Sequence, residues 1–489
     1  MIGGKLTRHL EAPAMNRTAA LYLPIPLVAA AGLLLSLNSC ANNSSSGGTT
    51  PPPSKIKHVV VIFQENRTPD NLFHDQNLIN AGADIASTGT NSQGQPVNLA
   101  PTSLGVDYDL SHAHSAFVAM YDNGKMDGAD RVTISCAKGA TDCPPPNAQF
   151  MYVQASDVEP YFQMAEQYTF GDRMFQTNQG PSFPAHQFII SGTSAPTQTS
   201  TLFIADNAQG VANSGGNTGC TSPPEEFVYL IDPFGAESST MYPCTDHPAL
   251  TDELDAKSIS WRYYTPSAGS LWTAPNAIEH LCGPNATPPN ATACTSSDWM
   301  NNVVLYTTQN PAPILTDIAN NQLATVSWVI PAGQNSDHAG STATTGGPSW
   351  VASIVNAIGN SPYWADTAIF VTWDDWGGWY DHVAPAVVSD GKSWGSGYVY
   401  GFRVPLIVIS PYAKAKYISH VTHDFGSILS FIENTFGLAS LGYADAHADD
   451  LSDCFNFDQT PLTFQTINAP VGADFFLHDT RPPTDPDDD

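Results

Sequence analysis

Four short runs of apolar, largely β-branched residues constrain the fold of this chain more than any other feature of its sequence. They occupy residues 56–63, 324–330, 367–373 and 404–409. Runs that are apolar on both faces are typical of buried strands in a parallel sheet, because helices cover both faces of such a sheet. Helical patterns alternate with them, at 159–168, 350–358 and 425–436. The alternation predicts an α/β fold with a doubly wound, mostly parallel central sheet.

Long segments rich in Gly, Pro, Asn, Thr and Ser interrupt this pattern, at 75–105, 130–150, 194–225 and 265–300. Candidate active-site residues fall on both sides of these segments, so we interpret them as loop insertions into one domain rather than as linkers. The predicted catalytic domain covers residues 55–479. The acidic end of the chain, at 480–489, is predicted to be a disordered tail.

The N-terminus has the pattern of an export signal. Three basic residues precede an uncharged stretch at 18–37, which is followed by the letters NSC, and the sequence LNSC ending at Cys40 resembles a bacterial lipoprotein cleavage box. We predict a lipoprotein-type signal peptide at 1–40, lipidation of Cys40 and a disordered tether at 41–54. The predicted location is the periplasm or the cell surface, with membrane attachment through Cys40. Plain secretion and a retained transmembrane anchor, which two prolines in the stretch weaken, are the alternatives.

The charge balance excludes some functions and favours a metal. The chain has 17 Lys and Arg residues against 46 Asp and Glu residues, for a net charge of −29. Nucleic-acid binding and electrostatic docking on anionic lipid both need clustered basic residues, so neither is expected. An anionic substrate would be repelled by the chain as a whole and would need a local cation.

The cysteines fit an exported protein. Seven remain when Cys40 is set aside, and six of them lie as neighbouring pairs in the sequence: Cys136 with Cys143, Cys220 with Cys244, and Cys282 with Cys294. Cys454 is left over. Six cysteines allow 15 connectivities, so pairing of neighbours is a hypothesis, and buried free thiols are the alternative.

Polar residues follow two of the apolar runs at the point where each predicted strand ends. Glu65 and Asn66 follow the first run, and Asp374 and Asp375 follow the third, just before Gly377 and Gly378. Ligands in open α/β sheets bind beyond the carboxyl ends of the strands. Adjacent carboxylates there are costly unless a cation neutralises them, and these oxygen ligands suit a divalent metal ion. A helix cap with a surface charge, and a simple turn, are the alternatives for the two pairs.

Ser182 precedes a helical pattern in which Pro184 suits an early position. A serine at this point can cap the helix. It can also be a nucleophile, because the positive end of a helix and a nearby metal stabilise an alkoxide and a phosphoryl group. The sequence around Ser182 alone leaves both interpretations open.

Four histidines are further candidates. His112 and His114 are expected on one side of an extended segment, whereas His338 and His382 each follow an aspartate. Such histidines can donate to phosphoryl oxygens or protonate a leaving group, and a structural role is the alternative for each.

Several blocks together resemble a known family. The segment KIKHVVVIFQENRTPDNLF resembles the opening motif of the metal-dependent phosphoesterase family, which includes bacterial non-haemolytic phospholipases C and acid phosphatase A type enzymes. Further matches follow in family order, across residues 55–440: YDLSHAHSAF with YDNGKMDGAD, QTNQGPSFPAHQFIISGTS, SDHAGS, TWDDWGGWYDHV, and FRVPLIVISPYAK with HDFGSILSFIE. The resemblance implies a fold like that of the alkaline phosphatase superfamily, a central sheet sandwiched by helices.

The resemblance also implies roles for residues. It implies one divalent metal ion held by Glu65, Asn66, Ser182, Asp374 and Asp375. Ser182 matches the nucleophile, which also touches the metal.

The histidines receive roles in the same way. His338 resembles a phosphate-contacting histidine, His112 or His114 supplies another, and His382 matches a further family histidine. Relatives often read T-x-P-N where this chain reads S-F-P-A-H, which places His186 where an Asn is usual and affects leaving-group contacts.

The implied activity is hydrolysis of phosphate esters by double displacement through a phosphoserine. The serine nucleophile, the Asp-Asp pair and the short segment after the last matched block favour an acid phosphatase-like phosphomonoesterase. Phospholipase C activity on phospholipid head groups is the alternative, and a non-catalytic surface-binding lipoprotein is the alternative of another class. The expected partner is therefore a phosphate-ester substrate.

Overall fold

The computed structural model describes residues 54–141, 143–210, 218–340, 346–388 and 398–484. The predicted signal peptide, Cys40 and nearly all of the predicted tether lie outside the described residues. Among the described residues, no helix combines the length and the apolar character that crossing a membrane requires.

The centre of the fold is an eight-stranded sheet with the order β14-β13-β15-β1-β16-β17-β8-β18. The strands are β14 (Val303–Leu305), β13 (Trp261–Thr265), β15 (Val326–Val329), β1 (His58–Gln64), β16 (Thr367–Trp373), β17 (Leu406–Ile409), β8 (Thr169–Gly171) and β18 (Tyr417–Ser419). Only β17 runs antiparallel to its neighbours in this sheet. The predicted α/β class with a mostly parallel sheet is therefore confirmed.

The direction predicted for the run at 404–409 is wrong. This run forms β17, which is buried along its whole length but pairs antiparallel with β16 and β8. A run that is apolar on both faces indicates a strand buried on both sides. Burial alone does not determine whether the strand runs parallel or antiparallel to its neighbours.

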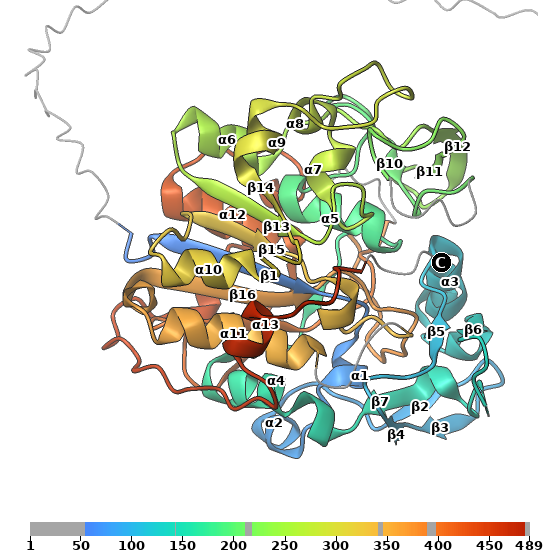
Figure 1. The fold of residues 1–489 in the computed structure, drawn as a ribbon. Helices are drawn as coiled ribbons and strands as arrows, with labels where there is room; N and C mark the ends of the chain where they lie inside the picture. The colour runs from blue at the N-terminus through green and yellow to red at the C-terminus, as the bar shows by residue number, and fades with distance from the viewer. Residues whose placement is uncertain (1–53, 142, 211–217, 341–345, 389–397, 485–489) are drawn as a thin grey trace, which may run out of the picture. The chain divides into compact units, whose positions relative to one another are not determined.

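Helices cover both faces of the sheet, as the rings on β16 show. Phe370 packs against Phe431 of α12 (Phe425–Phe436), with ring centroids 5.0 Å apart. Trp373, three residues further on, points to the opposite face and packs against Tyr161 of α4 (Ala155–Gln167) at 5.1 Å. The predicted sandwich of a sheet between helices is confirmed, and the two layers are visible in Figure 1.

The remaining helices group with these two layers or lie in the insertions. Those that contact α4 directly or through one another are α2 (Gln76–Ala81), α10 (Pro313–Ala319), α11 (Gly346–Gly359) and α13 (Ala473–Leu477). Those that contact α12 directly or through one another are α5 (Ser182–Ser191), α6 (Leu250–Ala256), α7 (Ala274–Ala277), α8 (Glu279–Cys282) and α9 (Ser297–Asn302). Helices α1 (Pro69–Leu72) and α3 (His114–Tyr121) follow β1 and β5.

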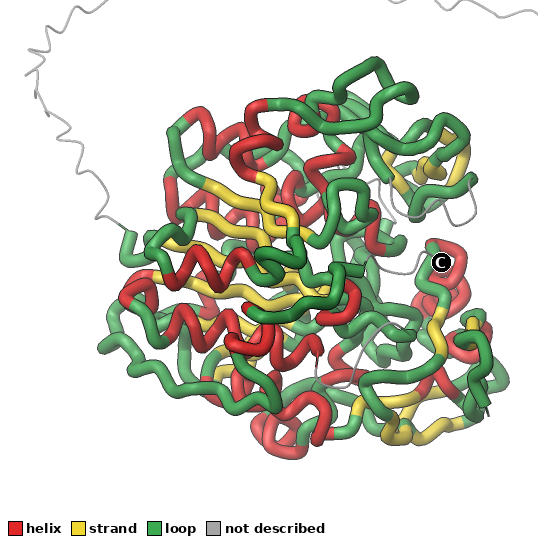
Figure 2. The backbone as a smooth tube through the Cα atoms, viewed as in Figure 1, coloured by secondary structure: helices red, strands yellow, loops and turns green. Residues whose placement is uncertain are grey.

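Small sheets lie outside the central sheet, some of them with strands in the insertions, and long loops join them (Figure 2). The paired strands are β2 (Thr88–Thr90) with β3 (Pro96–Asn98), β4 (Ala100–Thr102) with β7 (Met151–Val153), β5 (Tyr108–Leu110) with β6 (Ile134–Cys136), β9 (Met174–Phe175) with β19 (His423–Asp424), and β10 (Phe203–Ile204) with β11 (Val228–Ile231) and β12 (Glu237–Met241).

All three predicted disulfides are present, and two of them lie wholly within insertions. They join Cys136 to Cys143, Cys220 to Cys244, and Cys282 to Cys294. Cys454 is a buried free thiol. The disulfides cross-link loops that contribute few long strands or helices, and such cross-links reduce the conformational freedom of the unfolded loops.

The end of the described chain differs from the predicted disordered tail. The Gly333 N–H donates to the Thr484 carbonyl at 2.9 Å, and the Gln334 N–H donates to Thr484 Oγ1 at 3.0 Å. Residues 480–484 are thus tied to the body of the domain, because their backbone supplies hydrogen-bond partners that charge composition does not reveal. Residues 485–489 lie outside the described residues.

Candidate active site

The register of the two central strands brings the predicted acidic residues together. Gln64, the last residue of β1, pairs with Trp373, the last residue of β16. Glu65 and Asp374 therefore leave the sheet side by side at its carboxyl edge, followed by Asn66 and Asp375, and all four residues are fully buried. A surface charge beside a helix cap, the alternative for the first pair, is wrong, since Thr68 caps α1.

Backbone geometry holds the two loops in contact. Asn66 has a positive φ of 64°, and its N–H donates to Asp374 Oδ1 at 3.1 Å. Gly377 also has a positive φ, and a Cβ at this position would lie 2.3 Å from the Asn66 carbonyl oxygen. Glycine at this position permits the close backbone approach, and a side chain there would push the loops apart.

Ser182 points at the acidic cluster instead of capping its helix. It is the first residue of α5, its hydroxyl donates to Asp375 Oδ2 at 3.3 Å, and no side-chain capping bond forms at the preceding Pro181. The Phe183 N–H has no acceptor within the helix because it lies in the first turn, and it donates to Asn207 Oδ1 at 2.9 Å. The capping alternative for Ser182 is therefore wrong, and its hydroxyl is available for chemistry at the sheet edge.

His186 also faces this cluster, whereas the family resemblance implies only an effect on leaving-group contacts for this residue. It lies one turn after Ser182 on α5 and is fully buried. Its Nε2 atom lies 3.5 Å from Glu65 Oε1 and 3.7 Å from Asp374 Oδ2. Burial lowers the pKa of His186 to about 4, so the imidazole is neutral near pH 7. The four-residue spacing on a predicted helix was a signal that could have revealed this placement.

Many polar atoms of the cluster have no hydrogen-bond partner among the described residues. These atoms are both carboxylate oxygens of Glu65, Asn66 Oδ1, Asp374 Oδ2 and both ring nitrogens of His186. Ion pairs with Lys or Arg are not found for these carboxylates in the part of the chain that the structure describes. Burial and the charge of Asp374 raise the pKa of Glu65 well above its ordinary value. Buried carboxylates that converge without a cation fit a site for a divalent metal ion.

His112 and His338 border the cluster. Asn66 Nδ2 donates to His112 Nε2 at 3.2 Å, and His112 Nδ1 in turn donates to the Leu110 carbonyl at 2.9 Å. The ring of His338 lies 5.7 Å from that of His112, and its Nδ1 donates to the Ala339 carbonyl at 2.7 Å. His112 therefore holds the amide nitrogen of Asn66, while the amide oxygen is left without a hydrogen-bond partner among the described residues.

His114 lies in a different environment from His112. Its Nδ1 is 2.6 Å from Glu237 Oε1, and its Nε2 is 3.2 Å from Gln179 Oε1. The expected extended segment ends before this residue, because α3 begins at His114 and rotates its side chain away from that of His112.

His382 belongs to a second cluster of charges. Its Nδ1 lies 2.7 Å from Asp70 Oδ2 and its Nε2 lies 3.0 Å from Asp84 Oδ1. Arg403, fully buried, donates through Nε to both oxygens of Asp381 at 3.0 Å and through Nη2 to Asp70 Oδ1 at 3.3 Å. His382 therefore bonds to members of this second cluster, Asp70 and Asp84, and lies apart from the hydrogen bonds around Ser182.

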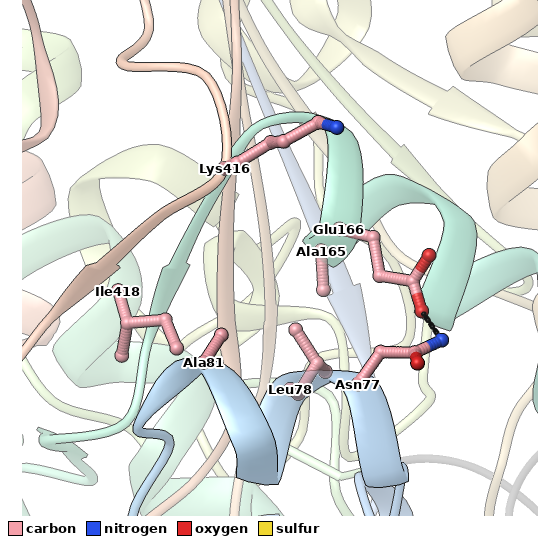
Figure 3. Close-up of a pocket in the computed structure, with 7 residues that line it drawn as sticks. All are labelled: Asn77, Leu78, Ala81, Ala165, Glu166, Lys416 and Ile418. Carbon is pink, nitrogen blue, oxygen red and sulfur yellow. Dashed lines mark hydrogen bonds between the residues drawn. The ribbon is translucent and has the colours of Figure 1, made fainter.

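One surface pocket lies near the amino ends of strands β8 and β18, whereas the acidic cluster follows the carboxyl ends of the strands. Its lining includes Asn77, Glu166 and Lys416, and the Asn77 amide donates to the Glu166 carboxylate at 2.8 Å (Figure 3). Glu166 precedes the start of β8 and Lys416 precedes the start of β18. Because the acidic cluster lies beyond the carboxyl ends of the strands, this pocket is separate from it.

Comparisons with known proteins agree with this geometry. The profile of the Phosphoesterase family matches residues 56–439. The chain is 24% identical to the hemolytic phospholipase C of Pseudomonas aeruginosa over 82% of this chain and 56% of that protein. It is 24% identical to phospholipase C B of Mycobacterium tuberculosis over 83% of this chain and 78% of that protein. The chain thus spans little more than half the length of the first of these relatives.

Solved structures give a weaker likeness. A protein in the alkaline phosphatase superfamily from Vibrio parahaemolyticus aligns with 83% of this chain and 75% of its own, at 10% identity and a TM-score of 0.35.

Proposed function

Because the chain belongs to the Phosphoesterase family, we propose that it is an exported, metal-dependent phosphoesterase that acts most readily as an acid phosphatase-like phosphomonoesterase. The observation that carries the proposal is the position of Ser182. Its hydroxyl lies at the amino end of α5 and contacts Asp375, beside buried carboxylates that have no Lys or Arg partner among the described residues. A hydroxyl placed this way is suited to attack the phosphorus of a substrate whose phosphate group is bound by a metal ion at these carboxylates.

The reaction that we propose is a double displacement. The Ser182 hydroxyl gives up its proton, its oxygen attacks phosphorus in line, the bond from phosphorus to the ester oxygen breaks, and the alcohol leaves after taking up one proton. Water then attacks the phosphoserine, which releases phosphate and returns a proton to Ser182. His338 contacts a phosphoryl oxygen, and His112 acts by orienting Asn66. Most of the work in such a transfer is positioning and charge neutralisation, which rigid buried groups supply.

One divalent metal ion completes this scheme. The residues that would hold it are Glu65, Asn66, Asp374, Asp375 and Ser182. This assignment is supported by the contacts of Asn66 with Asp374 and of Ser182 with Asp375, and by the oxygens of Glu65, Asn66 and Asp374 that have no partner among the described residues. Such an ion neutralises carboxylate charge and lowers the cost of forming the serine alkoxide. It would also supply the local cation that a chain of net charge −29 needs in order to bind a phosphate.

Phospholipase C activity is the second candidate, because the curated relatives reported above carry that name. The proposed export by a signal peptide at 1–40 and anchoring through lipidated Cys40 would place either enzyme near a membrane. The serine nucleophile and the Asp374–Asp375 pair support the phosphomonoesterase.

The test compares two substrates on the same purified protein. A chromogenic phosphomonoester and phosphatidylcholine vesicles are each incubated with chelator-treated protein, with and without added Mn²⁺, Zn²⁺ or Ca²⁺. We expect phosphate release from the monoester only, and only with metal. Release of phosphocholine at a higher kcat/KM would establish the phospholipase instead. Hydrolysis of neither ester by protein with bound metal would favour the non-catalytic binding lipoprotein.

A further inference from the structure

The helix that carries Ser182 presents a second side chain to the acidic cluster. Residues four apart on a helix share one face, so Ser182 and His186 of α5 project in the same direction. Ser182 reaches Asp375, and His186 reaches Glu65 and Asp374. Helix α5 therefore contributes the hydroxyl oxygen of Ser182 and the ring nitrogen of His186 to the acidic cluster.

The distances around His186 do not fit hydrogen bonds. Its Nε2 lies 3.5 Å from Glu65 Oε1 and 3.7 Å from Asp374 Oδ2, whereas a direct bond of this type spans about 2.7–3.2 Å. Two ligands that each lie about 2.1 Å from a shared transition metal ion are separated by about 3.0–3.4 Å. The three ligand atoms, all within 4.8 Å of one another, are thus spaced closely enough to share an ion after small movements.

The surroundings of the imidazole hold it in this position. Its ring lies between Phe63, at 6.1 Å, and Trp272, which it stacks on at 6.3 Å and 21°. Neither ring nitrogen has a hydrogen-bond partner among the described residues. A buried polar atom without a partner is unfavourable, so a metal ion that accepts the lone pair of the imidazole would remove this cost. Packing, rather than a second hydrogen bond, fixes the direction of Nε2.

We infer that His186 is a nitrogen ligand of the metal ion, bound through Nε2 next to Glu65 and Asp374. The inference rests on the proposed metal site and changes its chemistry. An imidazole among oxygen ligands favours Zn²⁺, Mn²⁺, Fe²⁺ or Co²⁺, whereas Ca²⁺ and Mg²⁺ prefer oxygen alone. His186 thereby restricts the choice of metal to the transition series.

Pulsed electron paramagnetic resonance on the full protein loaded with Mn²⁺ tests this assignment. We expect the wild-type protein to show ¹⁴N coupling from a directly bound imidazole. The coupling should disappear in His186→Gln and persist in His338→Gln, a buried histidine near the same cluster. The glutamine variant should still bind Mn²⁺, which shows that the protein folds and that its oxygen ligands remain.

Metal competition supplies a second measurement. We expect His186→Gln to lose about tenfold or more in affinity for Zn²⁺, with a smaller change for Mg²⁺. Wild-type protein with bound Mn²⁺ but no nitrogen coupling would overturn the role of His186 and leave the proposed phosphoesterase standing. Coupling that survives in His186→Gln would do the same, whereas failure to bind Mn²⁺ or Zn²⁺ would overturn both proposals.

Discussion

Two buried clusters of carboxylates and histidine follow the carboxyl ends of the central strands, and they differ in how their charge is neutralised. In the cluster around His382, the Arg403 guanidinium lies between Asp70 and Asp381 and donates to both. In the cluster around Ser182, the basic side chain near Glu65 and Asp374 among the described residues is His186, which is neutral near pH 7. The two clusters use similar residue types, but only one contains its own cation.

The difference indicates a structural role for the cluster around Arg403 and agrees with the chemical role that we propose for the cluster around Ser182. The Arg403 cluster joins the loops that follow β1, β8 and β16, because Arg403 also donates to the carbonyls of Asp84 and Asp172. In this cluster the Arg403 guanidinium supplies the positive charge that neutralises the carboxylates. We propose that an external cation has this role in the Ser182 cluster, where Lys and Arg are absent among the described residues.

Removal of the nucleophile should have the largest effect and should affect only one cluster. We expect Ser182→Ala to lower turnover of a phosphomonoester by about 10⁴-fold or more, because the attacking oxygen is absent. Phosphate release at saturating metal measures the loss. The matched control is Ser191→Ala, a buried serine at the other end of α5, which should retain activity. Wild-type turnover in Ser182→Ala would refute the phosphoserine mechanism.

Removal of the internal cation should have the largest effect on stability. Arg403→Met leaves Asp381 and Asp70 buried without their partner, which should lower the free energy of unfolding by about 3–5 kcal/mol. Urea unfolding of chelator-treated protein measures this change. Arg173→Met removes a half-buried guanidinium that pairs with Asp84, and this control should cost at most about 1 kcal/mol. Equal losses in the two variants would contradict the structural role of Arg403.

The sequence predicted the framework of the fold well, because burial leaves a direct mark on composition. The runs that form β1, β15, β16 and β17 stand out as apolar. Strand β13 contains Arg262, and strand β8 is three residues long, so neither gives such a run. Strand order and the direction of β17 depend on pairing between distant segments, which no local pattern encodes.

The candidate site was partly predictable for the same reason. Glu65 and Asp374 follow strand ends, and the register of β1 and β16 then places them side by side. The environments of His114 and His382 depend on partners far away in the sequence, such as Glu237 and Asp84. The place of His186 depends on the rotation of α5 about its axis, which becomes fixed only when the helix packs.

The same chemical change should have opposite effects in the two clusters. In metal-free protein, Glu65→Gln removes a carboxylate that lacks a basic partner, so we expect the free energy of unfolding to rise by about 1–2 kcal/mol. Asp381→Asn removes a carboxylate partner of Arg403 and should lower the free energy of unfolding. Urea unfolding with and without Zn²⁺ measures both variants, and Zn²⁺ should stabilise Asp381→Asn but not Glu65→Gln. Destabilisation of metal-free Glu65→Gln comparable to that of Asp381→Asn would erase the distinction.

The smallest expected effect is a pH dependence that the Arg403 cluster adds through His382. Burial opposes a charge on this imidazole, but its hydrogen bond with Asp70 and the charges of Asp70 and Asp381 raise its pKa to about 9. The folded protein therefore holds a proton that the unfolded chain releases above about pH 6.5. This contribution to stability is complete below about pH 6.5 and is lost as the pH rises through 9.

We expect wild-type protein to lose about 1–2 kcal/mol more than His382→Gln between about pH 6.5 and 9.5, a range that allows for partial solvent exposure. Urea unfolding at a series of pH values measures the difference. His280 also has a pKa raised to about 9, against the effect of burial, by hydrogen bonds with Asp252 and Asp246, so His280→Gln reports its separate share. Parallel pH profiles for wild-type protein and His382→Gln would show that the proton on His382 does not help to neutralise its cluster. Arg403 would then be the only internal cation that the cluster needs.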